Sequence, residues 1–174
     1  KDYDPIFQSY MLDIPNNEVR IGLMKSLIPY YITPDSRLTT STVINMARAL
    51  YKDDMDGMLR QLQEFLLTVP YCDNTAYEGH YQQVLYIIFS LLGIYTDIEV
   101  RTPRGRVDMV MRTATTLYVI ELKLDKSAGD AVKQIDLNDY PSRFALCGLP
   151  IVKVGINFDS GKRTIENWEI HPLP

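Results

Sequence analysis

Two consecutive apolar runs joined by a short polar connection constrain the fold more than any other part of the sequence. Residues 106–113 and 116–124 are rich in Val, Ile, Leu, Met and Tyr, a pattern typical of buried β-strands. If the turn is centred between Ala114 and Thr115, the two runs form a hairpin in which paired residues have numbers that sum to 229. The sequence therefore predicts both a pair of strands and their register.

This register brings charged side chains together on one face of the predicted hairpin. Asp108 and Glu121 are expected to lie directly opposite each other, with Cβ atoms about 4.5–5.5 Å apart. Lys123 lies two residues beyond Glu121 and is expected to share that face. Two opposed carboxylates destabilise a sheet, and one lysine cannot easily satisfy both. A bound Mg²⁺ would resolve the conflict, because this ion takes carboxylate and phosphate oxygens as ligands.

The rest of the chain divides near Pro70 into two parts. Residues 1–70 are expected to form a helical segment, with one helix capped by Asn16 or Asn17, a second starting near residues 40–41, and a third through residues 58–66. Asp53, Asp54, Asp56 and Gly57 are expected to separate the last two. Residues 71–174 have the pattern of an α/β domain. A helix over 76–93 is expected to be followed by three strands over 96–102, 106–113 and 116–124. A second helix over 128–140 and two strands over 150–158 and 163–170 complete the domain.

Net charge differs between the two halves of the chain. The whole sequence has a formal charge of −4, which by itself argues against a simple nucleic-acid-coating protein. Residues 1–100 hold 7 basic and 13 acidic side chains, whereas residues 101–174 hold 11 basic and 9 acidic ones. The strand region is therefore mildly positive, and Arg101, Arg104 and Arg106 form a local basic patch that can attract a phosphate backbone. An ordinary solvated hairpin face is the alternative.

Several other kinds of protein are disfavoured. Two cysteines 75 positions apart, with only two histidines, do not suit a disulfide framework or the usual zinc sites. The longest apolar run, residues 84–94, is too short to cross a bilayer, and no signal peptide is visible, so we expect a cytoplasmic protein without a membrane partner. Because the chain starts with Lys1 and not Met, we expect it to be part of a longer protein.

The pattern of Asp108 followed by Glu121-Leu122-Lys123 resembles the PD-(D/E)XK nuclease superfamily. That family places an Asp on one core strand and (Asp/Glu)-x-Lys on the next; Val107 stands where many members have Pro. The predicted order of elements also resembles the family's restriction-endonuclease-like αβββαβ core, a central mixed sheet flanked by helices, here preceded by a helical segment. The flanking stretches 77–82, 101–108 and 155–159 resemble a branch in which this domain follows an AAA-ATPase-like domain.

The resemblance implies roles for individual residues. Asp108 and Glu121 would be metal ligands, Lys123 the catalytic lysine, and Glu78 the acid contributed by the first helix. Gln134 would match a glutamine of the second helix, with Tyr140 as its companion. Each has a structural alternative: Glu78 completes a capping box, Gln134 is an exposed helix residue, Tyr140 packs in the core, and the carboxylates pair with basic side chains.

The function that the resemblance implies is Mg²⁺- or Mn²⁺-dependent hydrolysis of phosphodiester bonds in DNA, with RNA as the other candidate polymer. Arg101, Arg104 and Arg106 would contact phosphates, and an upstream AAA-ATPase-like domain would be a partner in the full-length protein. One alternative is a catalytically inactive module with the same fold that binds nucleic acid or a partner protein. A purely structural interaction domain is the other.

Overall fold

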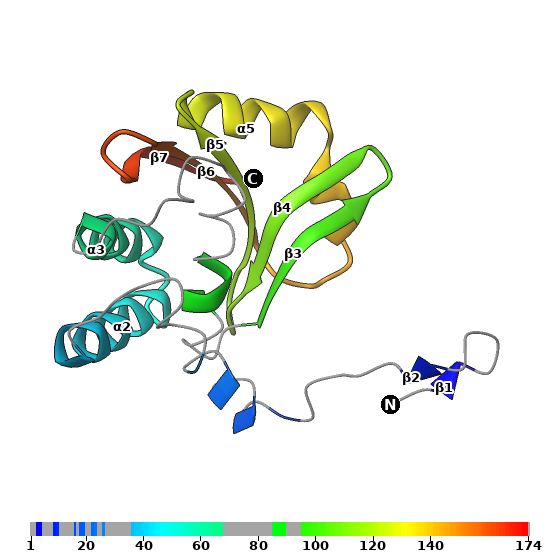
Figure 1. Cartoon of the computed structure of the whole chain (residues 1–174). Helices are drawn as coiled ribbons and strands as arrows, with labels where there is room; N and C mark the ends of the chain where they lie inside the picture. Colours follow the sequence, from blue (N-terminus) through cyan, green and yellow to red (C-terminus); the bar gives the residue numbers. More distant parts are fainter. Residues whose placement is uncertain are drawn as a thin grey trace.

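The computed structural model describes residues 3–4, 9–10, 16, 18–19, 22–23, 26, 36–67, 85–89 and 95–173 (Figure 1). Residues 85–89 are helical, and no helix in these ranges is long and apolar enough to span a membrane. The named elements are β1 (Tyr3–Asp4), β2 (Ser9–Tyr10), α2 (Ser36–Leu50), α3 (Met55–Leu67), β3 (Tyr95–Thr102), β4 (Gly105–Arg112), β5 (Leu117–Leu124), α5 (Ala128–Leu137), the 3₁₀-helix η1 (Tyr140–Phe144), β6 (Ile151–Asp159) and β7 (Thr164–Pro172).

A five-stranded mixed sheet in the order β3-β4-β5-β6-β7 forms the centre of the fold (Figure 1). β5 and β6 are parallel, and every other neighbouring pair is antiparallel. Only the parallel pair needs a crossover connection, and α5 supplies it. The predicted α/β class and the restriction-endonuclease-like arrangement are confirmed, with β1 and β2 pairing separately in a short ribbon.

Helices cover both faces of the sheet, and each face has its own apolar cluster. On one side α2, α3 and the helical residues 85–89 pack against side chains that include Met109, Ile120 and Ile156. On the other side Ile135 of α5 packs against Val107, Val110, Leu117 and Val119. The helical part before residue 70 therefore shares a core with the sheet. The domain boundary near residue 70 lies in 68–84, outside the described residues, and stays a prediction.

Helix ends differ from the expected ones for local reasons. α2 begins at Ser36, several residues before the expected start. α3 begins at Met55, because the Asp54 carboxylate accepts a hydrogen bond from Gly57 N at 2.8 Å and caps the helix there. α5 ends at Leu137, before the expected residue 140, and η1 follows with Pro141 in its first turn. Asp139, between the two helices, has φ 47°, a left-handed conformation that ends the α-helix at this point.

The contact between α5 and the sheet depends on a residue without a side chain. Gly155 of β6 pairs with Glu121 of β5 in the parallel ladder. A Cβ atom at position 155 would collide with the carbonyl oxygen of Ala128 and would lie 2.9 Å from Val132 Cγ2. The first turn of α5 thus lies directly on the sheet, in the row that contains Glu121.

We predict that Gly155→Ala destabilises the protein by about 1–3 kcal/mol, because the added methyl group overpacks a backbone contact. Gly129→Ala is the matched control: its Cβ would meet side-chain atoms only, the end of the flexible Glu169 and, at an ordinary contact distance, Ser127 Oγ, and alanine favours the helix. Urea unfolding measures both. Equal stability of the Gly155→Ala variant and the wild type would contradict the close contact.

Candidate active site

The β4–β5 hairpin has the predicted register. Its turn is closed by a hydrogen bond from Thr113 N to Thr116 O at 2.9 Å, so Ala114 and Thr115 form the two-residue loop. Four rungs follow whose residue numbers sum to 229, namely Met109–Ile120, Val110–Val119, Met111–Tyr118 and Arg112–Leu117. The strands that carry the candidate residues are therefore aligned as the sequence predicts.

At Asp108 the regular ladder stops, one rung before the expected Asp108–Glu121 pair. The last Cα pair is Met109–Ile120, and beyond it Leu122 N donates a hydrogen bond to Asp108 Oδ2 at 2.9 Å. The carboxylate takes the place of a backbone acceptor between the two strands. Asp108 and Glu121 are thus neighbours, but Asp108 reaches across the gap instead of forming a regular cross-strand pair.

Both β3 and β4 are irregular in this row. Glu99 of β3 lies across from Asp108 and has φ 52°, a left-handed conformation that costs a residue with a side chain about 1 kcal/mol. On β4, Val107 and Val110 pack on the same side of the sheet although they are three residues apart, so side-chain alternation breaks between them. Such irregularities bend strands and re-aim side chains. The pairs that frame the row are Ile98–Met109 and Val100–Val107.

Glu121 is a buried carboxylate whose two oxygens differ in their contacts. The residue is 1% exposed, and its Oε2 has no hydrogen-bond partner among the residues that the structure describes. Lys123 Nζ lies 3.2 Å from Glu121 Oε1 and also donates to the carbonyl oxygen of Leu122 at 2.9 Å. Buried carboxylate oxygens are normally hydrogen-bonded, so the orphaned Oε2 needs a ligand or a proton.

The same burial shifts the ionisation of both acids. Burial raises the pKa of Asp108, while the hydrogen bond from Leu122 and the Lys123 charge act against the rise. Burial also raises the pKa of Glu121 to about 7, the Asp108 carboxylate adds to this rise, and Lys123 opposes it. The two carboxylates together thus hold protons more tightly than ordinary acids do. A cation placed between them would favour their charged forms.

The three predicted phosphate-contacting arginines lie on the β3–β4 ribbon, and two of them have acidic partners. Arg106 Nη1 lies 3.0 Å from Glu99 Oε2, and Arg104 Nη1 lies 3.9 Å from Asp139 Oδ2. Arg101 is exposed and is the direct cross-strand partner of Arg106. The basic patch is present, and part of its charge is neutralised by nearby carboxylates.

The remaining predicted residues are not brought to the acidic pair by the described contacts. Gln134 lies half-buried on α5, and Glu78 is outside the described residues, so their roles stay predictions. Tyr140 is buried beneath the β3–β4 turn, with its hydroxyl accepting a hydrogen bond from Asn138 Nδ2 at 3.0 Å. These contacts favour a packing role for Tyr140.

Two residues beside the site were not predicted from the sequence. Glu99 could have been found by applying the register rule to the second hairpin, because residues paired across the β3–β4 turn have numbers that sum to 207. Asn157 of β6 is paired in register with Lys123 and is completely buried. It accepts a hydrogen bond from Lys126 N and donates one to Glu166 Oε2, which fixes the chain just after Lys123. The signal is a polar residue within the apolar run 154–158.

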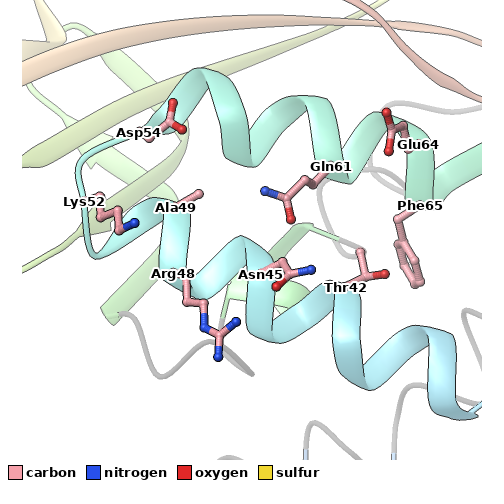
Figure 2. Close-up of a pocket in the computed structure, with 9 residues that line it drawn as sticks. All are labelled: Thr42, Asn45, Arg48, Ala49, Lys52, Asp54, Gln61, Glu64 and Phe65. Carbon is pink, nitrogen blue, oxygen red and sulfur yellow. The ribbon is translucent and has the colours of Figure 1, made fainter.

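A cavity of about 570 Å³ opens between α2 and α3 (Figure 2). None of the predicted site residues lines it, and Figure 2 shows its side chains projecting from the two helices and their connecting turn. Basic and acidic groups are mixed in its wall, and Asp54 is already engaged in capping α3. It offers no arrangement for metal or nucleophilic chemistry. The lining residues are Thr42, Asn45, Arg48, Ala49, Lys52, Asp54, Gln61, Glu64 and Phe65.

Comparison with known proteins agrees with this geometry. The family model of the PD-(D/E)XK nuclease superfamily matches residues 76–168, more than half of the chain. The chain is also 28% identical over 171 residues to a protein of Azotobacter chroococcum mcd 1, named as an uncharacterized protein in the vnfD 5′ region. The alignment covers 94% of this chain and 33% of the relative, so the chain spans about a third of that protein's length.

The raised pKa of Glu121 predicts a pH-dependent stability in metal-free buffer. The folded protein retains a proton up to about pH 7 that the unfolded chain releases near 4.5. The favourable contribution is present below pH 4.5 and is lost as the pH rises through 7. Relative to Glu121→Gln, the wild type should therefore lose up to about 3 kcal/mol of unfolding free energy between pH 4.5 and 8. Urea unfolding in EDTA measures this, and parallel profiles of the two proteins would contradict it.

Proposed function

Because the chain belongs to the PD-(D/E)XK nuclease superfamily, we propose that it hydrolyses phosphodiester bonds of DNA with Mg²⁺ or Mn²⁺ as cofactor. The observation that carries this proposal is the buried Glu121 carboxylate, which lies next to Asp108 and Lys123. Its Oε2 has no hydrogen-bond partner in the described part of the chain. A structural ion pair would leave no oxygen unsatisfied at such cost. In an active site that binds a cation, this oxygen would be one of the metal ligands.

The residues present fit a hard divalent cation. Asp108 and Glu121 offer carboxylate oxygens, the ligands that Mg²⁺ and Mn²⁺ prefer, and we assign Glu78 as the third acidic ligand. Among the described residues no group of three or more His, Cys, Asp and Glu side chains gathers to hold a metal, so the site needs Glu78, water or phosphate oxygens to complete it. When bound, the cation would supply a water molecule acidified for attack and charge to offset that of the phosphate.

Lys123 and the arginines would interact with the negative charge of the substrate. Lys123 Nζ is held beside Glu121 Oε1 by the strand and by the carbonyl oxygen of Leu122, so its position is fixed before substrate binds. A fixed ammonium group stabilises negative charge that develops on phosphorus as the new P–O bond forms and the old one breaks. Arg101, Arg104 and Arg106 would hold the flanking backbone, and Gln134 would contact the reacting phosphate or its ligands from α5.

We also propose that the chain works as the C-terminal part of a longer protein with an AAA-ATPase-like domain upstream. The resemblance of the flanking stretches supports this, and the Azotobacter relative is about three times as long as the matched region. In such a protein the helices α2 and α3 would transmit contacts from the upstream domain, because they share the core of the sheet.

Substitution of the acidic pair should abolish cleavage. We expect Asp108→Asn, Glu121→Gln and Lys123→Ala each to lower the rate of Mn²⁺- or Mg²⁺-dependent cleavage of a labelled DNA by at least about 100-fold, because each removes a fixed charge at the reacting phosphate. Asp136→Asn, an exposed carboxylate of α5, is the control and should cleave normally. Wild-type rates for Asp108→Asn and Glu121→Gln would disprove the site.

Metal binding should stabilise the folded chain. At a concentration ten times its Kd, Mn²⁺ should add about 1.4 kcal/mol to the unfolding free energy of the wild type and nothing to that of Glu121→Gln. Thermal unfolding with and without the ion measures both. If Mn²⁺ and Mg²⁺ leave the wild type unchanged at millimolar levels while DNA still binds, the chain is instead an inactive nucleic-acid-binding module.

A further inference from the structure

The β3–β4 ribbon places two arginines directly against each other. Arg101 and Arg106 are Cα partners in the antiparallel ladder, so their side chains start on the same face with Cβ atoms about 4.5–5.5 Å apart. Both residues are exposed. Like charges in this position are destabilising, and an anion between or beside them removes the penalty. The pair thus has the chemistry of a phosphate site, since guanidinium groups bind phosphate oxygens through two parallel hydrogen bonds.

Glu99 supplies an anion to this pair within the chain itself. Its Oε2 lies 3.0 Å from Arg106 Nη1, and both side chains remain about half exposed, at 47% and 58%. The contact is therefore accessible to a competing anion and is weakened by water and salt. Glu99 adopts its left-handed conformation at this position within the strand, so the residue whose carboxylate meets the arginine has a strained backbone. The Arg106 charge also acts on the Asp108 carboxylate, where it opposes the rise in pKa.

The two arginines lie on the same pair of strands as Asp108. Arg106 precedes Asp108 by two residues on β4, about 7 Å along the strand, and Glu99 lies on β3 between the partners of Met109 and Val107. The Arg106 charge acts on Asp108, so a backbone phosphate held by Arg101 and Arg106 would be bound on the same ribbon as one of the two acids. The negative charge of Glu99 also acts on Asp108, as expected for groups in one row.

We infer that Arg101 and Arg106 together bind a backbone phosphate of the nucleic acid, and that Glu99 is an internal competitor which that phosphate displaces. The inference deepens the proposed function, because it takes nucleic acid as the substrate. Glu99 lowers the affinity for every sequence equally, since it competes for backbone and not for bases. Glu99 therefore makes the binding of nucleic acid weaker and more readily reversible than it would be with the basic patch alone.

The test is the affinity of a fluorescently labelled DNA duplex, measured by anisotropy in EDTA so that the probe is not cleaved. Glu99→Gln should bind about two- to fivefold more tightly than the wild type, the range expected for one exposed ion pair. The slope of log affinity against log salt should steepen by about 0.9, one further phosphate contact. Glu99→Gly, which suits the left-handed backbone, should show the same gain. In an Arg106→Gln background, Glu99→Gln should have no effect.

Glu169→Gln is the matched control. Glu169 is also 47% exposed and carries the same charge, but it lies on β7, three strand spacings or about 14 Å from β4. This exceeds the Debye length of about 10 Å at 0.1 M salt, so the affinity should stay unchanged. An equal gain from Glu169→Gln, no gain from Glu99→Gln, or a gain that persists without Arg106 would overturn the inference alone. If neither the wild type nor Glu99→Gln binds or cleaves nucleic acid, the proposed function fails with it.

Discussion

The organisation of this chain depends on a carboxylate buried in the middle of a sheet. Glu121 is fixed on β5 between two neighbouring strands, is 1% exposed, and has one oxygen to which no described residue donates a hydrogen bond. A hydrophobic residue at this place would be more stable in the isolated protein. Lys123 offsets one oxygen, and Asp108 adds a second acid beside it. The free energy that this arrangement costs the folded chain is available to favour binding of a divalent cation.

The surrounding fold keeps this row from relaxing. The apolar clusters on both faces fix the positions of β4 and β5. Because Gly155 has no side chain, α5 packs directly against β6 in the row that contains Glu121. Asn157, paired with Lys123, fixes the segment that leads into α5. Where the ladder ends at Asp108, the carboxylate of this residue accepts the hydrogen bond from Leu122 N and links the two strands. Rigid elements therefore preserve a site whose own charges oppose its formation.

Much of this could be predicted from the sequence, because it follows from local rules. A two-residue turn and side-chain alternation set the register of the β4–β5 hairpin, and the strand and helix order gave the fold class. The end of the ladder at Asp108 could not be predicted, since it depends on a side-chain hydrogen bond to Leu122 N. The count of basic residues indicated the patch but not that Glu99 engages Arg106, because a charge sum ignores which groups face each other.

The central claim is that Glu121 Oε2 is a metal ligand, and crystallography with Mn²⁺ tests it most directly. Anomalous diffraction from crystals grown with Mn²⁺ should show one peak within about 2.3 Å of Glu121 Oε2 and in contact with Asp108, and none in Glu121→Gln. A wild-type map without a peak at this row, or with Mn²⁺ bound only at surface carboxylates such as Glu64, would contradict it. In that case the buried acid would be a protonated structural residue.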